Sequence, residues 1–433
     1  MTSVQKVSVL CDPSTYNGDL ALDLRSSNTW NVHSIADVRS AIYGAIDQSG
    51  VELRELNRHI HDNPELGYQE FIAYETLTNF LKKHDYTVKE HAYGLETSFE
   101  AECGTGGRLV VLCAEYDALP NIGHACGHNL IATSSIAAFL GLSKTLLNLG
   151  IAGRVRILGT PAEEGGGGKV KLLEAGAFKD NIAAAIMAHP MASHTYKDGH
   201  TGLAGFKLIA SHKLRIEFRG KPAHAGAEPH NGLNALDAAV SAYTSISMLR
   251  QQIRPDERIH GVIEQGGTVP NVITEFTIMN FNVRSPTIER ANELLARVKL
   301  CFEAAGLATG CSVSYKYAPT YMDLRANDAL SRQYVEDMAD LGEQIEFKQD
   351  ISATASTDMG NVSYAVPSFH GSFAISAPGG VTGHNPSFAA AAGTDAAHES
   401  AIRCAKGMAV LGYRVLTDLK LADAARLDFE TKP

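Results

Sequence analysis

The sequence predicts an α/β fold in which a mostly parallel sheet carries helices on both faces, with a smaller ferredoxin-like α+β domain inserted into it. Three short apolar segments, at 108–114, 154–159 and 181–188, have the length and composition of buried strands. Helical patterns separate them, and this alternation is typical of parallel sheets with crossover connections. After residue 205 the strands alternate between apolar and polar residues, which predicts the inserted domain.

Length and composition indicate an ordinary globular protein of two domains. A chain of 433 residues exceeds the size at which one hydrophobic core keeps growing. The net charge of −10 argues against nucleic acid and anionic membranes as partners. No uninterrupted run of about 18 apolar residues appears, so we expect no membrane span.

Cysteine usage and the start of the chain predict a reduced, cytoplasmic protein. The seven cysteines are scattered and odd in number, unlike a disulfide framework. Residues 1–31 lack the basic segment and apolar run of a secretory signal. Residues 1–34, which include the only tryptophan, Trp30, are predicted as an N-terminal arm.

The first part of the larger domain, 35–205, begins with helices. Apolar periodicity predicts a long amphipathic helix over 35–61, which ends at a turn cluster. A helix over 130–149 follows the first buried strand, and Gly150 fits the position just after its end. Further expected elements are a helix at 73–84 and strands at 87–91 and 98–103.

Residues that can bind a metal follow all three buried strands. They are Cys126 with His128, Glu163 with Glu164, and His189. Because parallel strands end at one edge of the sheet, we expect these side chains to converge. A thiolate and an imidazole two residues apart can bind one cation, typically zinc. The alternative is a buried, unreactive Cys126 beside a helix-start His128.

The pair Glu163-Glu164 precedes four glycines and favours a functional loop over a solvated acidic one. At an irregular strand end, one carboxylate can bind a metal while the other activates a water. His194 and His200 compete with His189 as ligands, but both lie in a loop-like stretch.

Asp117 either orients a ligand histidine or caps a turn.

Residues 320–433 complete the larger, catalytic domain, with a strand expected at 373–376 and a final helix over 391–417. His384 stands in a turn of this segment, and a surface role is its alternative.

Residues 206–319 are predicted as the inserted domain because their elements follow the order β-α-β-β-α-β. The expected strands are 213–218, 259–264, 274–284 and 312–317, and the expected helices are 233–251 and 287–305. His224, Asn271 and Arg284 are polar groups of this domain that could bind a carboxylate or an oxyanion. Turn chemistry and a surface arginine are the alternative.

Taken together, these motifs resemble a family of metallopeptidases and amidohydrolases that includes aminoacylase, glutamate-releasing carboxypeptidases and indole-acetyl-amino-acid hydrolases. The resemblance covers about 50–415, and it looks most like the branch with aminobenzoyl-glutamate hydrolase and β-alanyl (Xaa-Arg type) dipeptidase-like proteins. The motifs include Asn63-Pro-Glu-Leu-Gly67, Asp117-Ala-Leu-Pro120, His124-Ala-Cys-Gly-His128, Pro161-Ala-Glu-Glu-Gly165, Gly220-Lys-Pro-Ala-His224, Ser356-Thr-Asp-Met-Gly360 and His384-Asn-Pro386.

The resemblance implies a site for two metal ions per subunit, usually zinc and sometimes manganese, in a homodimer or higher homo-oligomer built through the inserted lid domain. The implied ligands are Cys126, His128, Glu164, His189 and His384. The other implied roles are general acid/base for Glu163, supporting carboxylate for Asp117, oxyanion stabilisation from the neighbouring subunit for His224, and substrate-carboxylate contacts for Asn271 and Arg284.

We therefore expect metal-dependent hydrolysis of the amide bond of an N-acyl amino acid or dipeptide, with Glu163 deprotonating a metal-activated water. Asn129 departs from the aspartate of many relatives, and the lost charge puts the second metal ion in question. Two alternatives stay open: a thiol hydrolase with Cys126 as nucleophile, and a non-catalytic peptide-binding protein of the same fold.

Overall fold

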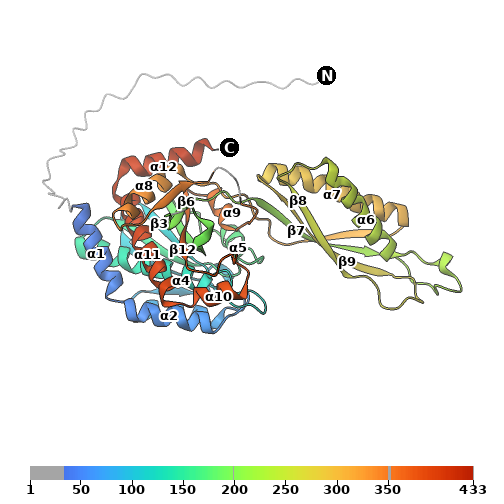
Figure 1. Ribbon diagram of the computed structural model, residues 1–433, viewed down its shortest axis with the longest axis horizontal. Helices are drawn as coiled ribbons and strands as arrows, with labels where there is room; N and C mark the ends of the chain where they lie inside the picture. The colour runs from blue at the N-terminus through green and yellow to red at the C-terminus, as the bar shows by residue number, and fades with distance from the viewer. Residues whose placement is uncertain (1–33, 198, 350–352, 433) are drawn as a thin grey trace, which may run out of the picture.

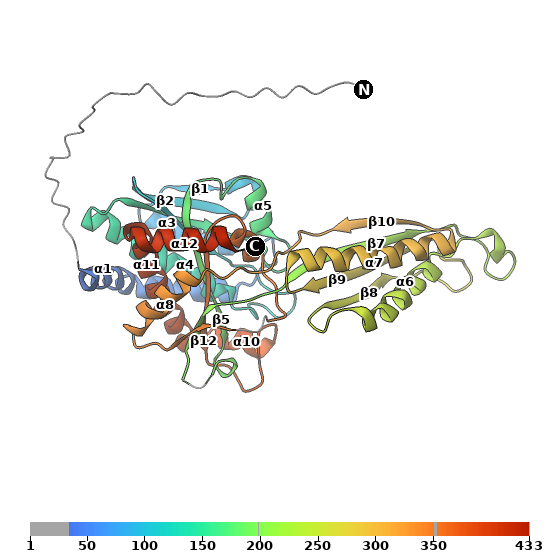
Figure 2. The same ribbon diagram turned by 90° about the horizontal axis from the view of Figure 1, so that it is seen from above.

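The computed structural model describes residues 34–197, 199–349 and 353–432, which form two lobes (Figure 1). The larger lobe contains an eight-stranded sheet, and the smaller, elongated lobe contains a four-stranded sheet with helices on one side (Figure 2). Apart from Ser34, the predicted N-terminal arm lies outside the described residues.

The larger sheet has a parallel core with antiparallel additions on both sides. Its strand order is β1-β2-β4-β3-β5-β12-β6-β11, and the four strands from β4 to β12 are parallel. The strands are β1 (Val88–Glu90), β2 (Phe99–Thr105), β3 (Leu109–Ala114), β4 (Gly153–Gly159), β5 (Ile182–Ala192), β6 (Gly202–Gly205), β11 (Ile345–Lys348) and β12 (Ser368–Ile375). The predicted α/β class is confirmed.

Both faces of this sheet are buried, which explains the continuous apolar runs of its central strands. In β3, Val110 and Leu112 join the core on one face, whereas Val111 and Cys113 join the core on the other. The first face is covered mainly by α4 (His128–Leu149) and α11 (Asp395–Thr417), and the second by α5 (Gly168–Glu174) and α9 (Met359–Ser363).

Two long helices predicted from periodicity are interrupted in the structure. The segment 35–61 forms α1 (Ile35–Asp47) and α2 (Gly50–Asp62), because the weak helix formers Ser49 and Gly50 allow a break there. The helix predicted over 391–417 starts later, as α11, because its first two residues belong to the end of α10 (Pro386–Ala392), and a further helix follows it. The remaining helices of the larger lobe are α3 (Phe71–Lys83), α8 (Asp328–Ala339) and α12 (Leu419–Thr431).

Helix α4 is the one described helix that is long and apolar enough to span a membrane, by length and composition. The sequence analysis did not find this helix, because it required an uninterrupted run of about 18 apolar residues. However, 89% of its apolar window is buried inside the fold, where it packs against α1, α11 and the sheet. The helix is therefore the central helix of the larger lobe's core.

The smaller lobe has the predicted order β-α-β-β-α-β. Its elements are β7 (Ala210–Arg219), α6 (Ala235–Leu249), β8 (Arg258–Gln265), β9 (Phe276–Ser285), α7 (Ile288–Thr309) and β10 (Ser312–Tyr317). The strands pair in the order β10-β7-β9-β8, with every pair antiparallel. The domain boundaries at 206 and 319 stay a prediction.

Candidate metal centre and active site

The polar residues predicted at the strand ends meet at the C-terminal edge of the parallel core. Strand β3 ends shortly before Asp117, and β4 ends shortly before Glu163. The sequence predicted that this strand would end at Ala188, directly before His189. In the structure, β5 continues to Ala192 because β12 pairs with it over that length. A paired strand, rather than a loop, therefore holds His189.

Two tight turns bring the other side chains to this edge. Gly127 has a φ of +78°, and a Cβ atom there would lie 2.5 Å from Cγ of Pro190, so only glycine lets this loop pack on β5. Ala162, directly before Glu163, also has left-handed backbone, with a φ of +56°. Gly127 adopts this conformation without steric cost, whereas Ala162 accepts an unfavourable one at the site.

The candidate ligand atoms form two groups that share Cys126. The ligand atoms of Cys126, His128 and His189 lie within 4.8 Å of one another, and so do those of Cys126, Glu164 and His384. Sγ of Cys126 is 3.3 Å from Nε2 of His189, and Nε2 of His384 is 3.1 Å from Oε1 of Glu164. The arrangement can hold two cations side by side.

One buried ligand atom, Nε2 of His128, has no hydrogen-bond partner among the described protein groups. Oε1 of Glu164 is also buried, and it faces Nε2 of His384, which is itself a candidate ligand. An unpaired buried polar atom costs about 1–3 kcal/mol, so the cluster needs a compensating partner. A set of sulfur, imidazole and carboxylate donors suits zinc, and these residues therefore fit a metal centre.

Asp117 contacts both halves of this cluster. Its Oδ1 is 3.0 Å from Nδ1 of His128, and its Oδ2 accepts a hydrogen bond from the backbone N–H of Glu164 at 2.8 Å. Burial raises the pKa of Asp117, but His128 and the backbone N–H groups outweigh burial, and the net pKa lies below its ordinary value. The ionised carboxylate can therefore orient two candidate ligands at once.

Glu163 lies beside the ligand cluster and lines its cavity. The side chain is largely buried, and one of its carboxylate oxygens lies within 4.8 Å of ligand atoms of His128 and Glu164. Burial, followed by the charges of Glu115 and Glu164, raises the pKa of Glu163 well above its ordinary value. Such an environment suits a carboxyl group that takes up and returns a proton.

A buried ion cluster behind Glu163 was missed by the sequence reasoning. Nζ of Lys169 donates to Oε1 of Glu115 at 2.5 Å and to Oδ1 of Asp358 at 2.7 Å. All three side chains are at most 1% exposed. Two features of the sequence could have pointed to this cluster. Lys169 directly follows the run of four glycines, and Asp358 belongs to the motif 356–360.

A cavity of about 550 Å³ opens onto the site and includes one of the predicted substrate contacts. Arg284 lines it, and its Nη1 donates to the backbone carbonyl of Thr354 at 2.9 Å. Lys213, which was not predicted, lines the same cavity, with Nζ 4.0 Å from the ring centroid of Tyr321. His194 and His200 belong to none of the candidate ligand groups.

The structure does not bring His224 and Asn271 to this cavity. The start of β7 contacts the larger lobe, where the backbone N–H of Ser211 donates to the carbonyl of Tyr321. The loop that holds His224 follows the opposite end of β7, and a hydrogen bond from Ala225 N–H to the Asn271 carbonyl joins the two loops. Both residues therefore lie at the far end of the smaller lobe.

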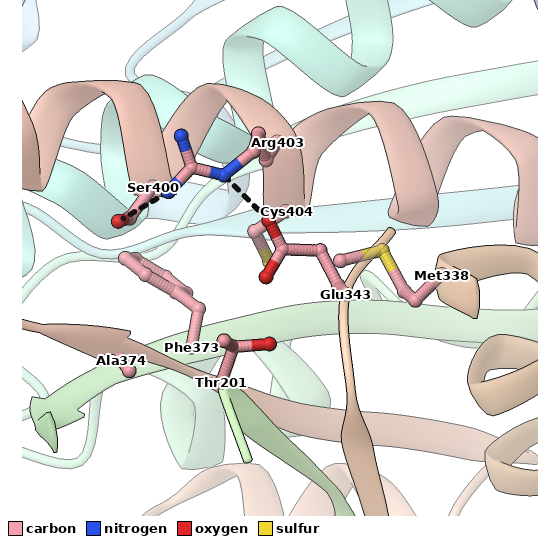
Figure 3. A pocket seen from close by; sticks show the side chains of 8 residues that line it. All are labelled: Thr201, Met338, Glu343, Phe373, Ala374, Ser400, Arg403 and Cys404. Atoms are coloured by element: carbon pink, nitrogen blue, oxygen red, sulfur yellow. Dashed lines mark hydrogen bonds and ion pairs between the residues drawn. The ribbon is translucent and has the colours of Figure 1, made fainter. Parts of the chain in front are cut away.

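A second cavity, of about 50 Å³, lies beside α11 (Figure 3). It is bounded by α11, β12 and the end of α8, and it contains the ion pair of Arg403 with Glu343 at 2.6 Å. None of the candidate ligands lines it. The chemistry of the described residues is therefore concentrated in the larger cavity.

Comparison with known proteins agrees with this geometry. Residues 111–405 match the model of peptidase family M20/M25/M40. The chain belongs to this family. It is 38% identical over 403 residues to the Xaa-Arg dipeptidase of Mus musculus, covering 89% of this chain and 91% of the relative. The family predicted from the motifs, and with it a metal-dependent hydrolase, is confirmed.

Two further relatives of this M20 protein are informative. It is 28% identical over 338 residues to a p-aminobenzoyl-glutamate hydrolase of Escherichia coli K12, covering 72% of this chain and 69% of the relative. The fold matches that of a dinuclear metal-binding M20 peptidase from Bacillus subtilis with a TM-score of 0.61 at 22% identity, covering 86% and 99% of the two chains.

The unusual Asn129 of this M20 protein does not face the ligand cluster. Its Nδ2 donates to Oδ1 of Asn57 and to the carbonyl of Ala392, both at 3.1 Å, and its side chain is fully buried. It belongs to none of the candidate ligand groups. Asn129 therefore links α4 to α2 and α10 and is not among the candidate ligands.

Proposed function

We propose that this M20 protein hydrolyses the amide bond of dipeptides or N-acyl amino acids with two zinc ions per subunit. The observation that carries the proposal is the pair of ligand groups sharing Cys126, with the buried Glu163 beside them. The names of its relatives, a dipeptidase and an aminobenzoyl-glutamate hydrolase, support the same class of substrate.

The proposed zinc ligands are Cys126, His128, Glu164, His189 and His384. When bound, zinc supplies Lewis acidity, which polarises the scissile carbonyl and lowers the pKa of water toward about 7. Manganese is the alternative metal, but a thiolate shared by both groups favours the softer zinc. The dinuclear structural neighbour supports two ions, and the proposed ligand set does not require the side chain of Asn129, which bonds to Asn57 and Ala392.

Glu163 is the proposed general acid/base. Its buried carboxylate takes a proton from the attacking water and then gives it to the nitrogen of the leaving amine. Asp117 keeps His128 and the Glu164 backbone in place during both steps. Arg284, in the wall of the same cavity, is the proposed contact for the substrate carboxylate.

We propose a homodimer built through the smaller lobe. The strand β8 lies at the edge of its sheet and exposes Val262 and Ile263, which are 58% and 37% accessible. An edge strand with exposed apolar side chains is suited to pairing with another chain. Dimerisation would let His224 and Asn271 serve the site of the partner, because they lie far from their own.

A reducing, cytoplasmic location is also part of the proposal. All six cysteines among the described residues are free thiols, and they include the proposed ligand Cys126. An oxidising compartment would expose these thiols to oxidation, and a thiolate ligand would then be lost.

Hydrolysis of a panel of dipeptides and N-acyl amino acids, combined with metal analysis, tests the proposal. We expect about two zinc ions per chain, loss of activity in chelator and recovery when zinc is added. The substitution Glu163→Gln should keep the metal but lower kcat at least a hundredfold, since general acid–base catalysis contributes about that much or more. Hydrolysis by metal-free protein that a thiol alkylator abolishes would instead support Cys126 as a nucleophile. Unchanged activity in Glu163→Gln would point to a non-catalytic protein.

A further inference from the structure

His370 is a buried histidine that faces the large cavity without a protein partner. It lies on β12, and pairing of Ser372 with His189 places His370 on the same face of the sheet as His189. The side chain is only 5% exposed, and neither ring nitrogen hydrogen-bonds to a described protein group. Because His370 lines the cavity, its unpartnered ring lies beside any molecule bound there.

Burial favours the neutral form of the His370 ring, which is separate from the candidate metal ligands. Burial, followed by the nearby His189 and Lys169, lowers the pKa of His370 well below its ordinary value. A neutral imidazole offers one donor and one acceptor. The ring centroids of His370 and His189 are 6.4 Å apart, and His370 belongs to none of the candidate ligand groups.

Apolar side chains line the cavity on which His370 opens. The ring of Phe206 meets that of His370 edge-on, with centroids 5.7 Å apart, and Leu208 and Met191 line the same cavity. Among the described residues of this cavity, the only carboxylates are Glu163 and Glu164. Both already have proposed roles in catalysis and metal binding, so none of the described lining residues is left to pair with a cationic substituent.

We propose that His370 determines specificity by hydrogen-bonding an uncharged polar group on an otherwise apolar substituent of the substrate. A phenol, an indole N–H or a carboxamide has this chemistry, whereas a guanidinium or ammonium group finds no free counter-ion among the described lining residues. The substrate would therefore differ from the arginine dipeptides for which the mouse relative is named. That the bound molecule is a substrate rests on the proposed function, but the binding preference does not require hydrolysis.

Calorimetric titration of the zinc-loaded Glu163→Gln protein tests this binding directly. The probes are N-acetyltyrosine against N-acetylphenylalanine, and N-acetylglutamine against N-acetylnorleucine, with N-acetylarginine as the cationic probe. The polar member of at least one pair should bind about threefold to tenfold more tightly, as one hydrogen bond predicts. Adding His370→Leu should bring that ratio to about one, and His370→Gln should retain part of it.

His398→Leu is the matched control. His398 is also a buried histidine with an unpartnered nitrogen, but it lies on α11 and does not line the cavity. The binding ratio should survive this substitution. The inference would be overturned by equal binding within both pairs or by a ratio that survives His370→Leu. It would also be overturned if N-acetylarginine bound most tightly, or if His370→Leu caused loss of zinc. Lack of hydrolysis by the parent chain would overturn the proposed function and leave these ratios unaffected.

Discussion

The carboxylate of Glu70 accepts a hydrogen bond from the backbone N–H of Ala162 at 2.8 Å. Its other oxygen accepts one from the hydroxyl of Thr97, also at 2.8 Å. Because Ala162 has left-handed backbone and directly precedes Glu163, Glu70 stabilises the turn that presents the proposed base. Burial, followed by the charge of Asp117, raises the pKa of Glu70 to about 7.

This pKa predicts a pH-dependent effect of Glu70→Gln on stability. The folded state favours the protonated carboxyl, so the wild-type free energy of unfolding should fall as pH rises from about 4.5 to about 7. The glutamine variant lacks this loss and should gain up to about 3 kcal/mol relative to wild type across that range. Urea unfolding at pH 5 and pH 8 measures the change. Thr97→Ala leaves the carboxyl in place but removes a hydrogen bond that lowers its pKa, so its stability should fall with pH at least as much as that of wild type. A Glu70→Gln difference that is constant with pH would contradict the assignment.

Removing Lys169 should destabilise the larger lobe strongly. Lys169→Met leaves Glu115 and Asp358 buried without their cation, which typically costs about 3–5 kcal/mol. Denaturant unfolding checks this value. Lys197→Met is the control, because the ion pair of Lys197 with Glu346 lies at the surface and such pairs contribute about 0–1 kcal/mol. Equal losses in the two variants would show that burial of the cluster is not the source of the effect.

Asp117→Asn should weaken zinc binding without removing a proposed ligand. The substitution replaces the charged partner of Nδ1 of His128, and loss of such a partner commonly lowers metal affinity by about 10-fold to 100-fold. Competition with a fluorescent zinc chelator gives the dissociation constant. The proposed supporting role fails if the affinity of Asp117→Asn equals that of wild type.

Asn129→Asp should change stability rather than metal content. An aspartate at this position would lose the N–H groups that now bond to Asn57 and Ala392, and it would bring its charge toward two acceptors. We expect a loss of about 1–3 kcal/mol in the free energy of unfolding, with the zinc stoichiometry unchanged. Parallel unfolding and metal analysis measure both quantities. An increase in bound zinc would place residue 129 at the metal centre after all.

A charge on the exposed edge strand should dissociate the proposed dimer. Val262→Lys places an ammonium group where β8 would meet its partner. Sedimentation velocity should show a dimer for wild type and a monomer for the variant at micromolar concentration. Leu427→Lys alters a similarly exposed apolar residue on α12 of the larger lobe, and this control should stay dimeric. A dimer that resists Val262→Lys would exclude β8 as the interface.

The parallel core and its ligand-bearing edge were predictable for a simple physical reason. Strands such as β3, buried on both faces, appear in the sequence as uninterrupted apolar runs. Polar residues directly after such runs, including Asp117 and Glu163, must then lie at one edge. Helix breaks were harder to predict, because the apolar face continues across Ser49 and only weak local propensity marks the interruption.

Other parts of the site depend on contacts that no local pattern reveals. Lys169 has the appearance of a surface lysine, and its partners Glu115 and Asp358 lie 54 and 189 positions away along the chain. The orientation of His370 into the cavity follows from the register of β12 against β5, which the sequence does not specify. The separation of His224 from its own cavity likewise becomes visible only when β7 is placed in space.

Lys169 supplies a positive charge inside the carboxylate cluster, and this charge is part of the chain itself. Carboxylate oxygens of Glu115, Glu163 and Asp358 lie within 4.8 Å of one another, a spacing that can hold a metal ion. The amine of Lys169 donates hydrogen bonds to Glu115 and Asp358, and each chain carries one such amine. These carboxylates are therefore balanced by a charge of the chain itself, and only the neighbouring candidate ligand groups would depend on a bound metal.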